Sequence, residues 1–484
     1  MDDGGCSLIA GGLDAKNQVG WGRWIHVNFY IRAMDDFEQP AFRAAAGIAA
    51  TLRRAGYDAY FAGGCVRDLL LGVAPKDYDV ASSATPDVVL EMFPQTQAVG
   101  AHFGVVLVRS VDGTMTEVAT FRKDGAYSDG RRPDAVSYTR DAREDVLRRD
   151  ITINGMLLDP EKLAETGNVA AATLDYVDGR SDLADRVVRA IGDPVQRFTE
   201  DKLRMLRAVR FAARLEFAIE AATFAAIREL APQIHDVSAE RVRDELTRML
   251  TEGHAARAFE LLDASGLLEQ VLPEVSRMKG VEQPPEYHPE GDVWVHTLLL
   301  LAQLPAGCSA TLAWGALLHD VGKPPTFERA PDRIRFNGHA EVGTRMAAEI
   351  CRRLRFSLVD TEQIEALVAN HMRFGDVMQM RESTLKRFFR LRDFDEHLAL
   401  HRMDCLSSHR NLQLYDFASE RYHSLPPETV KPQLLVTGND LIAAGYVPGE
   451  SFQVMLAAAE DAQLERRIHS TAEGMELIRS LFPS

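Results

Sequence analysis

A glycine pair, an arginine and two closely spaced aspartates stand together early in the chain. They are Gly63, Gly64, Arg67, Asp77 and Asp79. Glycines let a phosphate approach the main chain. The helix expected after them offers free N–H groups to an anion, and an arginine can make a bidentate contact with a phosphate. Two aspartates two residues apart share one face of a strand, and their repulsion favours a bound cation such as Mg²⁺. A lone Asp-x-Asp is usually a solvated pair, but this combination predicts two-metal catalysis by Asp77 and Asp79, in which a hydroxyl attacks a phosphate and pyrophosphate leaves.

A second charged group, Arg148, Arg149 and Asp150, lies near residue 150. Two guanidinium groups beside a carboxylate can contact a phosphate and a ribose hydroxyl together, and an enzyme acting on RNA needs a group that reads the 2′-hydroxyl. A self-satisfied Arg–Asp pair at a helix end explains the same residues. Arg148 and Asp150 are therefore candidates for a nucleotide site, and Arg149 is a weaker one.

A third group lies in a basic island from residue 186 to residue 214, which holds eight basic and three acidic residues. Asp201 and Arg204 are spaced to share one face of a helix, and Arg207 and Arg210 continue that face. One carboxylate and one guanidinium match the amino donor and ring acceptor that cytosine and adenine both present, but not uracil or guanine. A good bidentate match discriminates by about 1–3 kcal/mol. An ordinary helical ion pair is the simpler reading; base selection without a template is the functional one.

Ligand-type side chains recur on a helical background in the second half of the chain: His296, His319, Asp320, His339, His371 and Asp404. The adjacent His319-Asp320 offers a nitrogen and an oxygen ligand at one point, which His296 and Asp404 could complete, while His339 and His371 could supply a second metal. Mixed nitrogen and oxygen ligation leaves Mg, Mn, Fe, Ni and Zn open. Histidines satisfied within a core are the alternative.

Local patterns indicate the elements that must position these groups. Apolar runs that end at glycines predict short strands mixed with helices up to about residue 170. From about residue 194, apolar residues recur every three to four positions, which predicts helices. Expected helices are 42–56 and 66–71, and expected strands are 57–62, 78–80, 105–108 and 117–121. We expect an α+β head followed by an all-helical remainder.

The length of 484 residues allows several domains. The expected division is a poorly patterned extension (1–33), a head (34–172), a helical neck and body (173–282), a histidine-rich domain (283–405) and a helical tail (406–484). The formal net charge of −16 argues against general coating of nucleic acid, because phosphate binding needs local positive charge. Five scattered cysteines, no long apolar run and no signal-peptide pattern favour a reduced, cytoplasmic protein without a membrane span.

The motifs of the first half resemble those of class II tRNA nucleotidyltransferases and bacterial poly(A) polymerases. The opening motif, residues 63–68 with 76–79, implies a polymerase-β-like head in which Asp77 and Asp79 hold Mg²⁺ and Gly64 and Arg67 contact the triphosphate. Residues 144–154 resemble the ribose-recognition motif of the family. Residues 197–211 resemble its base-selecting segment, which implies that Arg207 and Arg210 lie near the triphosphate.

The histidine-rich region resembles the HD phosphohydrolase superfamily, and residues 288–297 resemble HD domains fused to tRNA nucleotidyltransferases. This resemblance implies hydrolysis of a phosphate ester, such as a 2′,3′-cyclic phosphate on RNA, with Lys323 meeting a phosphate. The leading hypothesis is addition of C, C and A to tRNA from CTP and ATP. Poly(A) synthesis and partial CC or A addition stay open, as does an HD phosphohydrolase with an inactive, RNA-binding head.

Overall fold

The structure, a computed structural model, describes residues 39–98, 104–125, 136–285 and 288–483. The expected N-terminal extension lies outside these residues.

The chain divides into two compact units. The first contains the residues up to 204 together with 218–223, and the second contains 205–217 and the residues from 224 onward. The finer division expected from the sequence stays a prediction.

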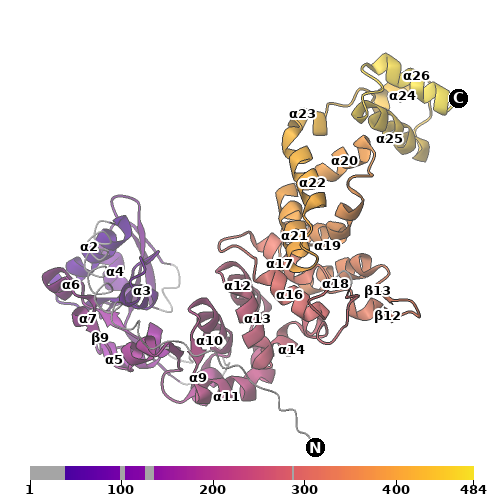
Figure 1. The fold of residues 1–484 in the computed structure, drawn as a ribbon. Coiled ribbons are helices and arrows are strands. Elements are labelled where there is room, and N and C mark those ends of the chain that lie inside the picture. The colour runs from indigo at the N-terminus through magenta and orange to yellow at the C-terminus, as the bar shows by residue number, and fades with distance from the viewer. Residues whose placement is uncertain (1–38, 99–103, 126–135, 286–287, 484) are drawn as a thin grey trace, which may run out of the picture. The chain divides into compact units, whose positions relative to one another are not determined.

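A seven-stranded mixed sheet forms the centre of the first unit (Figure 1). The strand order is β3-β4-β5-β2-β1-β8-β9, and β2 pairs with β5 in parallel while the other neighbours are antiparallel. The strands are β1 (Ala59–Ala62), β2 (Asp79–Ser82), β3 (Thr96–Gln97), β4 (Val105–Arg109), β5 (Met115–Thr120), β8 (Leu157–Leu158) and β9 (Thr173–Leu174). A separate antiparallel pair is β6 (Arg122–Asp124) with β7 (Val136–Tyr138). The expected mixed sheet with helices is confirmed.

Helix α2 (Pro40–Arg54) packs on this sheet because its buried residues recur at helical spacing. Its Phe42 ring meets the rings of Phe61 on β1 and Tyr78, each with a centroid separation of 5.4 Å. The other helices of this unit are α3 (Gly64–Leu70), α4 (Pro86–Met92), α5 (Ala142–Leu147), α6 (Pro160–Thr166), α7 (Val169–Ala172), α8 (Gly179–Ala184) and α9 (Pro194–Glu200). The short parallel pair β10 (Val187–Val188) and β11 (Ala218–Ile219) completes it.

The second unit is almost wholly helical, as expected. Its elements are α10 (Leu203–Arg214) and α11 (Ala221–Leu230), both of which begin in the first unit, then α12 (Ala239–Thr251), α13 (Ala255–Ala264), α14 (Leu267–Val271), α15 (Pro273–Ser276), α16 (Val293–Leu301), α17 (Ala310–Leu318), α18 (His339–Arg353), α19 (Leu358–Asn370), α20 (Glu382–Phe389), α21 (Phe394–Ser407), α22 (Gln413–Ser424), α23 (Pro427–Val430), α24 (Gly438–Ala443), α25 (Glu450–Leu464) and α26 (Thr471–Leu481). The hairpin β12 (Glu328–Arg329) and β13 (Ile334–Arg335) interrupts the helices.

Helices α16 and α17 are apolar on nearly every face, which is typical of helices buried in a core. They carry His296 and lead directly into His319. After α17 the chain passes the start of α18 so closely that a Cβ on Gly322 would overlap the carbonyl oxygen of His339. Glycine at this position therefore lets the His319-Asp320 segment reach His339.

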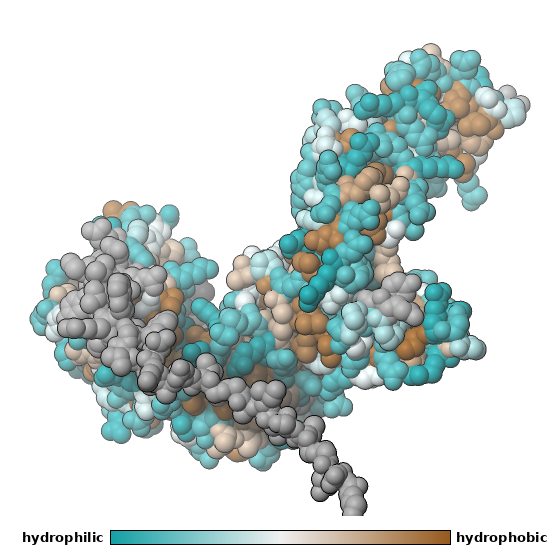
Figure 2. All heavy atoms as spheres, in the orientation of Figure 1, coloured by the Kyte–Doolittle hydropathy of each residue, from teal (hydrophilic) through white to brown (hydrophobic). Residues whose placement is uncertain are grey.

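The C-terminal helices α24, α25 and α26 form a small core of their own, built from Val436, Leu441, Met455, Ala459, Met475 and Ile478. In the view of Figure 2 this part of the chain shows hydrophobic side chains among mostly hydrophilic ones. Among the described residues, no helix combines the length and the apolar run needed to cross a membrane.

Candidate functional site

Three carboxylates gather at the start of strand β2 in the first unit. Asp79 is the first residue of β2, and because Val80 pairs in parallel with Val118 on β5, Glu117 stands beside Asp79 on the neighbouring strand. Removal from water, then the charges of Glu117 and Asp77, raise the pKa of Asp79 to about 7. Partial removal from water and the charge of Asp77 also raise the pKa of Glu117. This electrostatic coupling shows that the three groups form one acidic cluster.

Asp77 lies outside the strand that was expected to carry both aspartates. Strand β1 ends at Ala62, which pairs with Asp79, so β1 leaves no partner for Asp77. Asp77 is exposed, Asp79 is half-buried, and the two are close enough to interact electrostatically. The cluster therefore depends on a loop residue, a strand residue and the neighbouring strand rather than on one strand face.

The glycine turn lies between β1 and α3. Gly63 has φ of +76°, a conformation that favours glycine, and it precedes the first residue of α3, Gly64. Arg67 is buried, and its guanidinium donates to Asn154 Oδ1 at 2.6 Å and pairs with Asp68 at 2.7 Å. The structure thus holds Arg67 rigidly beneath the turn, and its expected contact with a phosphate stays a prediction.

One buried carboxylate, Asp145, orients both arginines of the second group. Arg148 Nη2 and Arg149 Nη2 lie 2.6 Å and 2.9 Å from its two oxygens. Burial acts to raise the pKa of Asp145, but Arg149 and Arg148 outweigh it, so that the pKa falls below its usual value. Asp150 is buried, and its side chain accepts from the Ile151 amide at 2.9 Å.

Arg149 lies near both the glycine turn and the acidic cluster. A Cβ on Gly63 would lie 3.7 Å from Arg149 Nη1. The charge of Arg149 also lowers the pKa of Asp79, against the three influences that raise it. The sequence ranked Arg149 below Arg148, because nothing in the local spacing shows which guanidinium turns toward β2.

The expectation that Asp201 stands within a helix beside Arg204 is wrong. Helix α9 ends at Glu200, and Asp201 has extended backbone angles (φ −147°, ψ 106°) at the break before α10. Its side chain accepts from the Leu203 amide at 3.1 Å, so it caps the start of α10. The pair predicted to select the base therefore lies at a helix junction rather than on one helix face.

Arg204 is instead held by neighbours of its own unit. Its guanidinium pairs with Glu200 at 2.6 Å and donates to the main-chain oxygens of Arg197 and Arg148, each at 3.1 Å. Glu200 and Arg197 are also paired, at 2.9 Å. This network links the junction at Asp201 to the Arg148 segment.

Arg207 and Arg210 belong to the second unit. Arg210 is buried and pairs with Glu245 at 2.7 Å and with Glu252 at 3.1 Å, whereas Arg207 lies 3.9 Å from Glu245. Removing one partner of such a buried pair costs about 3–5 kcal/mol. Arg210 thus has a structural role, because its pair with Glu245 joins α10 to α12. Its expected contact with a nucleotide stays a prediction.

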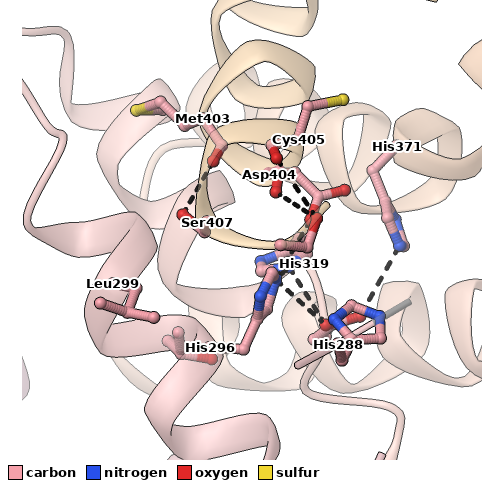
Figure 3. A network of polar contacts seen from close by, with 12 residues as sticks. His288, His296, Leu299, His319, His371, Met403, Asp404, Cys405 and Ser407 are labelled. Carbon is pink, nitrogen blue, oxygen red and sulfur yellow. Dashed lines mark hydrogen bonds and ion pairs between the residues drawn. The ribbon is translucent and has the colours of Figure 1, made fainter. Parts of the chain in front are cut away.

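The structure brings together all six ligand-type residues of the histidine-rich region. His296 Nε2 lies 3.1 Å from Asp404 and 3.3 Å from His319 Nε2, and these residues converge in Figure 3. His339 Nε2 lies 3.2 Å from His371 Nε2. One carboxylate, Asp320, stands between the two histidine pairs. Its Oδ2 is 3.2 Å from His319, and its Oδ1 is 3.7 Å from His339 and 3.8 Å from His371.

The ring geometry of these histidines favours cations between them. Nδ1 contacts a main-chain oxygen in His319 (2.8 Å), His339 (2.9 Å) and His371 (2.6 Å). If Nδ1 carries the proton, Nε2 presents a lone pair toward the cluster. Two facing lone pairs at 3.2–3.3 Å repel each other unless a proton or a metal ion lies between them. Two groups of ligand atoms result, one from His296, His319 and Asp404 and one from Asp320, His339 and His371.

A cavity of about 630 Å³ opens onto this cluster. Asp320, His339, His371 and Asp404 line it together with three cationic side chains, Lys323, Arg333 and Arg335. Lys323 is buried and pairs with Asp320 at 2.7 Å. A cavity lined by acidic and imidazole side chains together with cationic ones could accept an anionic substrate bound to a metal.

Comparison with known proteins decides the family. The model "Poly A polymerase head domain" matches residues 59–189, "Probable RNA and SrmB- binding site of polymerase A" matches 216–279, and "HD domain" matches 295–406. A CCA-adding enzyme of Levilactobacillus brevis is 32% identical over 420 residues, which are 87% of this chain and 92% of that protein. The chain belongs to the family of CCA-adding enzymes.

Other CCA-adding enzymes match more strongly over a shorter stretch. Those of Geobacillus thermodenitrificans and Geobacillus stearothermophilus are 43% identical over 229 residues, 47% of this chain. These matches span 54%, or about half, of the relatives' own length. A solved CCA-adding enzyme of Bacillus stearothermophilus in complex with CTP has a TM-score of 0.69 at 26% identity, over 92% of this chain and 99% of that one. One from Thermotoga maritima, complexed with tRNA, shares the fold with a TM-score of 0.55 at 16% identity, over 93% of this chain and 98% of that one.

Several residues that contact the predicted site residues of this CCA-adding family member were not among those expected from the sequence. Three of them bind a predicted site arginine: Asp145 contacts Arg148, Asn154 contacts Arg67 and Glu200 contacts Arg204. In the histidine cluster, Glu290 accepts from His296 Nδ1 at 2.7 Å. Asp145 could have been found from its spacing of three and four residues to the two arginines. Asn154 and Glu290 offered no such signal, because their partners depend on the folded chain.

Proposed function

We propose that the protein adds C, C and A to the 3′ end of tRNA from CTP and ATP without a nucleic-acid template. The observation that carries this proposal is the acidic cluster of Asp77, Asp79 and Glu117 beside Arg149, in a chain of the CCA-adding family. The CTP complex of the Bacillus stearothermophilus relative supports the nucleotide substrate. The four described cysteines are free, in keeping with a cytoplasmic enzyme.

The donor set at the acidic cluster fits Mg²⁺. Carboxylate oxygens are the protein ligands that Mg²⁺ prefers, and the pKa of Asp79 is raised by removal from water and by the neighbouring charges of Glu117 and Asp77, which a bound cation would offset. Asp77 and Asp79 would hold the ions, and Glu117 is positioned to assist. Bound Mg²⁺ supplies the charge that activates a 3′-hydroxyl and stabilises departing pyrophosphate.

The surrounding side chains of the first unit would bind and orient the nucleotide. Gly63 and Gly64 leave the main chain open to a triphosphate, and Arg67 and Arg148 add positive charge. Asp150 would accept from the ribose. The family motif also implies a role in triphosphate binding for Arg207 and Arg210, which stays a prediction. The base-selecting pair would be Asp201 and Arg204, whose guanidinium is fixed in place by Glu200.

The activity is tested with purified protein and tRNA that lacks its last three nucleotides, incubated with CTP and ATP separately and together. Growth by CC with CTP alone and by CCA with both nucleotides supports the proposal. A long ladder with ATP would indicate a poly(A) polymerase, and growth that stops at CC or requires a CC end would indicate a partial enzyme. An absence of growth would favour an inactive head on an HD phosphohydrolase.

Base choice is expected to relax in the variant Asp201→Asn. The side-chain oxygen of the introduced asparagine can still accept from the Leu203 amide, so the helix cap is retained, but the amide group no longer presents a carboxylate to the base. Discrimination of CTP against UTP should fall by about 10-fold or more, since a bidentate match is worth about 1–3 kcal/mol. The measurement is kcat/KM for CTP and UTP on the same tRNA. Asp185→Asn, an exposed acid of the same unit, is the control, and unchanged discrimination in Asp201→Asn would exclude the role.

The Mg²⁺ requirement is expected to depend on pH near neutrality. Protons compete with Mg²⁺ for Asp79, whose pKa is about 7 in the protein without metal. The Mg²⁺ concentration for half-maximal incorporation should therefore be about 10-fold higher at pH 6 than at pH 8. Rates measured across Mg²⁺ titrations at the two pH values provide the test. Equal half-maximal concentrations would show that Asp79 is not protonated in competition with the metal.

A second activity, hydrolysis of a phosphate ester at the histidine cluster, is favoured by the two facing Nε2 pairs around Asp320. The donors fit divalent metals that accept nitrogen and oxygen ligands, and their identity stays open. His296, His319, Asp320 and Asp404 would hold one ion, and Asp320, His339 and His371 a second. The bound metal would polarise a phosphate and activate water, while Lys323 neutralises Asp320 and faces the substrate cavity. RNA ending in a 2′,3′-cyclic phosphate is the substrate to test, with a series of divalent metals.

A further inference from the structure

The four histidines of the cluster are not held alike. His319, His339 and His371 each place Nδ1 against a main-chain oxygen at 2.6–2.9 Å. His296 places Nδ1 against a carboxylate oxygen of Glu290, at 2.7 Å. A histidine with a carboxylate behind it is a more basic metal ligand than one with a neutral carbonyl.

Only 7% of the Glu290 side chain is exposed, and the same oxygen that accepts from His296 also faces His288 Nδ1 at 2.9 Å. His288, Glu290 and His296 could themselves be taken for a metal triad. The two nitrogen–oxygen distances are instead ordinary hydrogen-bond lengths, and both nitrogens meet a single oxygen. Glu290 therefore acts from behind the cluster, as a hydrogen-bond acceptor, rather than as a ligand.

The carboxylate of Glu290 adds to the difference in negative charge between the two halves of the cluster. The half built from His296, His319 and Asp404 has a carboxylate of its own, shares Asp320, and has Glu290 behind His296. The half built from His339 and His371 has only Asp320 within its ligand group. Added negative charge and a fixed ring orientation both strengthen binding of a cation.

We propose that Glu290 is a positioning residue that fixes the ring of His296 and makes the His296, His319 and Asp404 half the tighter of two metal sites. The proposal rests on the phosphohydrolase site proposed above. Metal would then bind in two steps. The first ion would bind at the His296, His319 and Asp404 half and depend on Glu290, and the second would bind at the His339 and His371 half and not depend on it.

The test is titration of the metal-free full-length protein with Co²⁺, followed by calorimetry and by the visible absorption of bound Co²⁺. The wild type should bind two ions in distinguishable steps. In Glu290→Gln, which keeps an acceptor but loses the charge, the first step should weaken by about 10–100-fold while the second is unchanged. Glu290→Ala, which loses both, should weaken the first step further and shift its absorption bands.

Glu282→Gln removes an exposed acid eight residues away, whose partner Arg329 is also exposed, and should leave both steps unchanged. A general loss of structure would lower the unfolding temperature and weaken both steps together, which would overturn the proposal. Wild-type affinity and spectrum in both Glu290 variants would also overturn it while leaving the phosphohydrolase proposal intact. If the wild type bound Co²⁺ at neither half of the cluster, both the Glu290 proposal and the phosphohydrolase proposal would be overturned.

Discussion

Replacing Asp79 with asparagine is expected to reduce nucleotide incorporation into tRNA by at least about a thousandfold, which corresponds to roughly 4 kcal/mol of transition-state stabilisation. Asparagine has nearly the same shape, so β2 and its pairing with β1 and β5 should persist. The variant loses the half-buried charge that Asp77 and Glu117 surround. Single-turnover incorporation of labelled CTP at saturating Mg²⁺ measures the loss.

The matched control for this substitution is Asp87→Asn, an exposed acid in the first turn of α4 in the same unit. It should incorporate CTP at the wild-type rate. If Asp79→Asn retained more than about a tenth of wild-type activity, the acidic cluster would not be the reaction centre, because loss of even one preorganised stabilising group usually costs about 100-fold or more.

Replacing Asp320 with asparagine is expected to abolish hydrolysis at the histidine cluster, with a loss of more than about 100-fold in metal affinity. Asp320 is the one described residue with oxygens facing both histidine pairs, so its loss affects both proposed ions. Metal content after dialysis and cleavage of RNA with a terminal 2′,3′-cyclic phosphate are the two measurements. Addition of CCA by the same preparation should remain at the wild-type rate, because the acidic cluster is untouched.

Asp320 also neutralises the buried Lys323, so its variant is accompanied by a second one that spares this pair. Asp404→Asn removes a carboxylate from the His296 half alone. It should lose one ion and retain the other. Two retained ions in both variants, with hydrolysis intact, would contradict the proposed ligands.

Much of the first site was predictable because its chemistry is local. The glycine turn, Asp77 and Asp79 lie within 17 consecutive residues. The short helix α3 and the antiparallel pairing of β1 with β2 bring the two ends of this segment together. Spacing along the chain does not show that Glu117 joins them, since its place beside Asp79 depends on the parallel pairing of β2 with β5. Cross-strand neighbours of this kind are set by sheet order, which periodicity along the chain does not reveal.

Spacing along the chain also failed to show that a helix ends at Asp201. The charged residues from Arg197 to Arg210 fit a continuous helix by spacing, but an aspartate can cap a new helix as readily as it can stand within one. The structure breaks the helix there, and Arg204 finds Glu200 at 2.6 Å. The six residues that converge in the histidine cluster could be selected from their types, whereas Glu290 offered no such signal, because its contact with His296 at 2.7 Å depends on the folded chain.

The proposed transferase requires that Asp77 and Asp79 hold divalent cations over the incoming nucleotide. Anomalous diffraction from crystals grown with Mn²⁺ and CTP locates the metal without reference to activity. We expect Mn²⁺ peaks in contact with the carboxylates of Asp77 and Asp79 and with the phosphates of CTP. Ordered CTP with no Mn²⁺ at these two aspartates, and peaks only among the histidines, would contradict it.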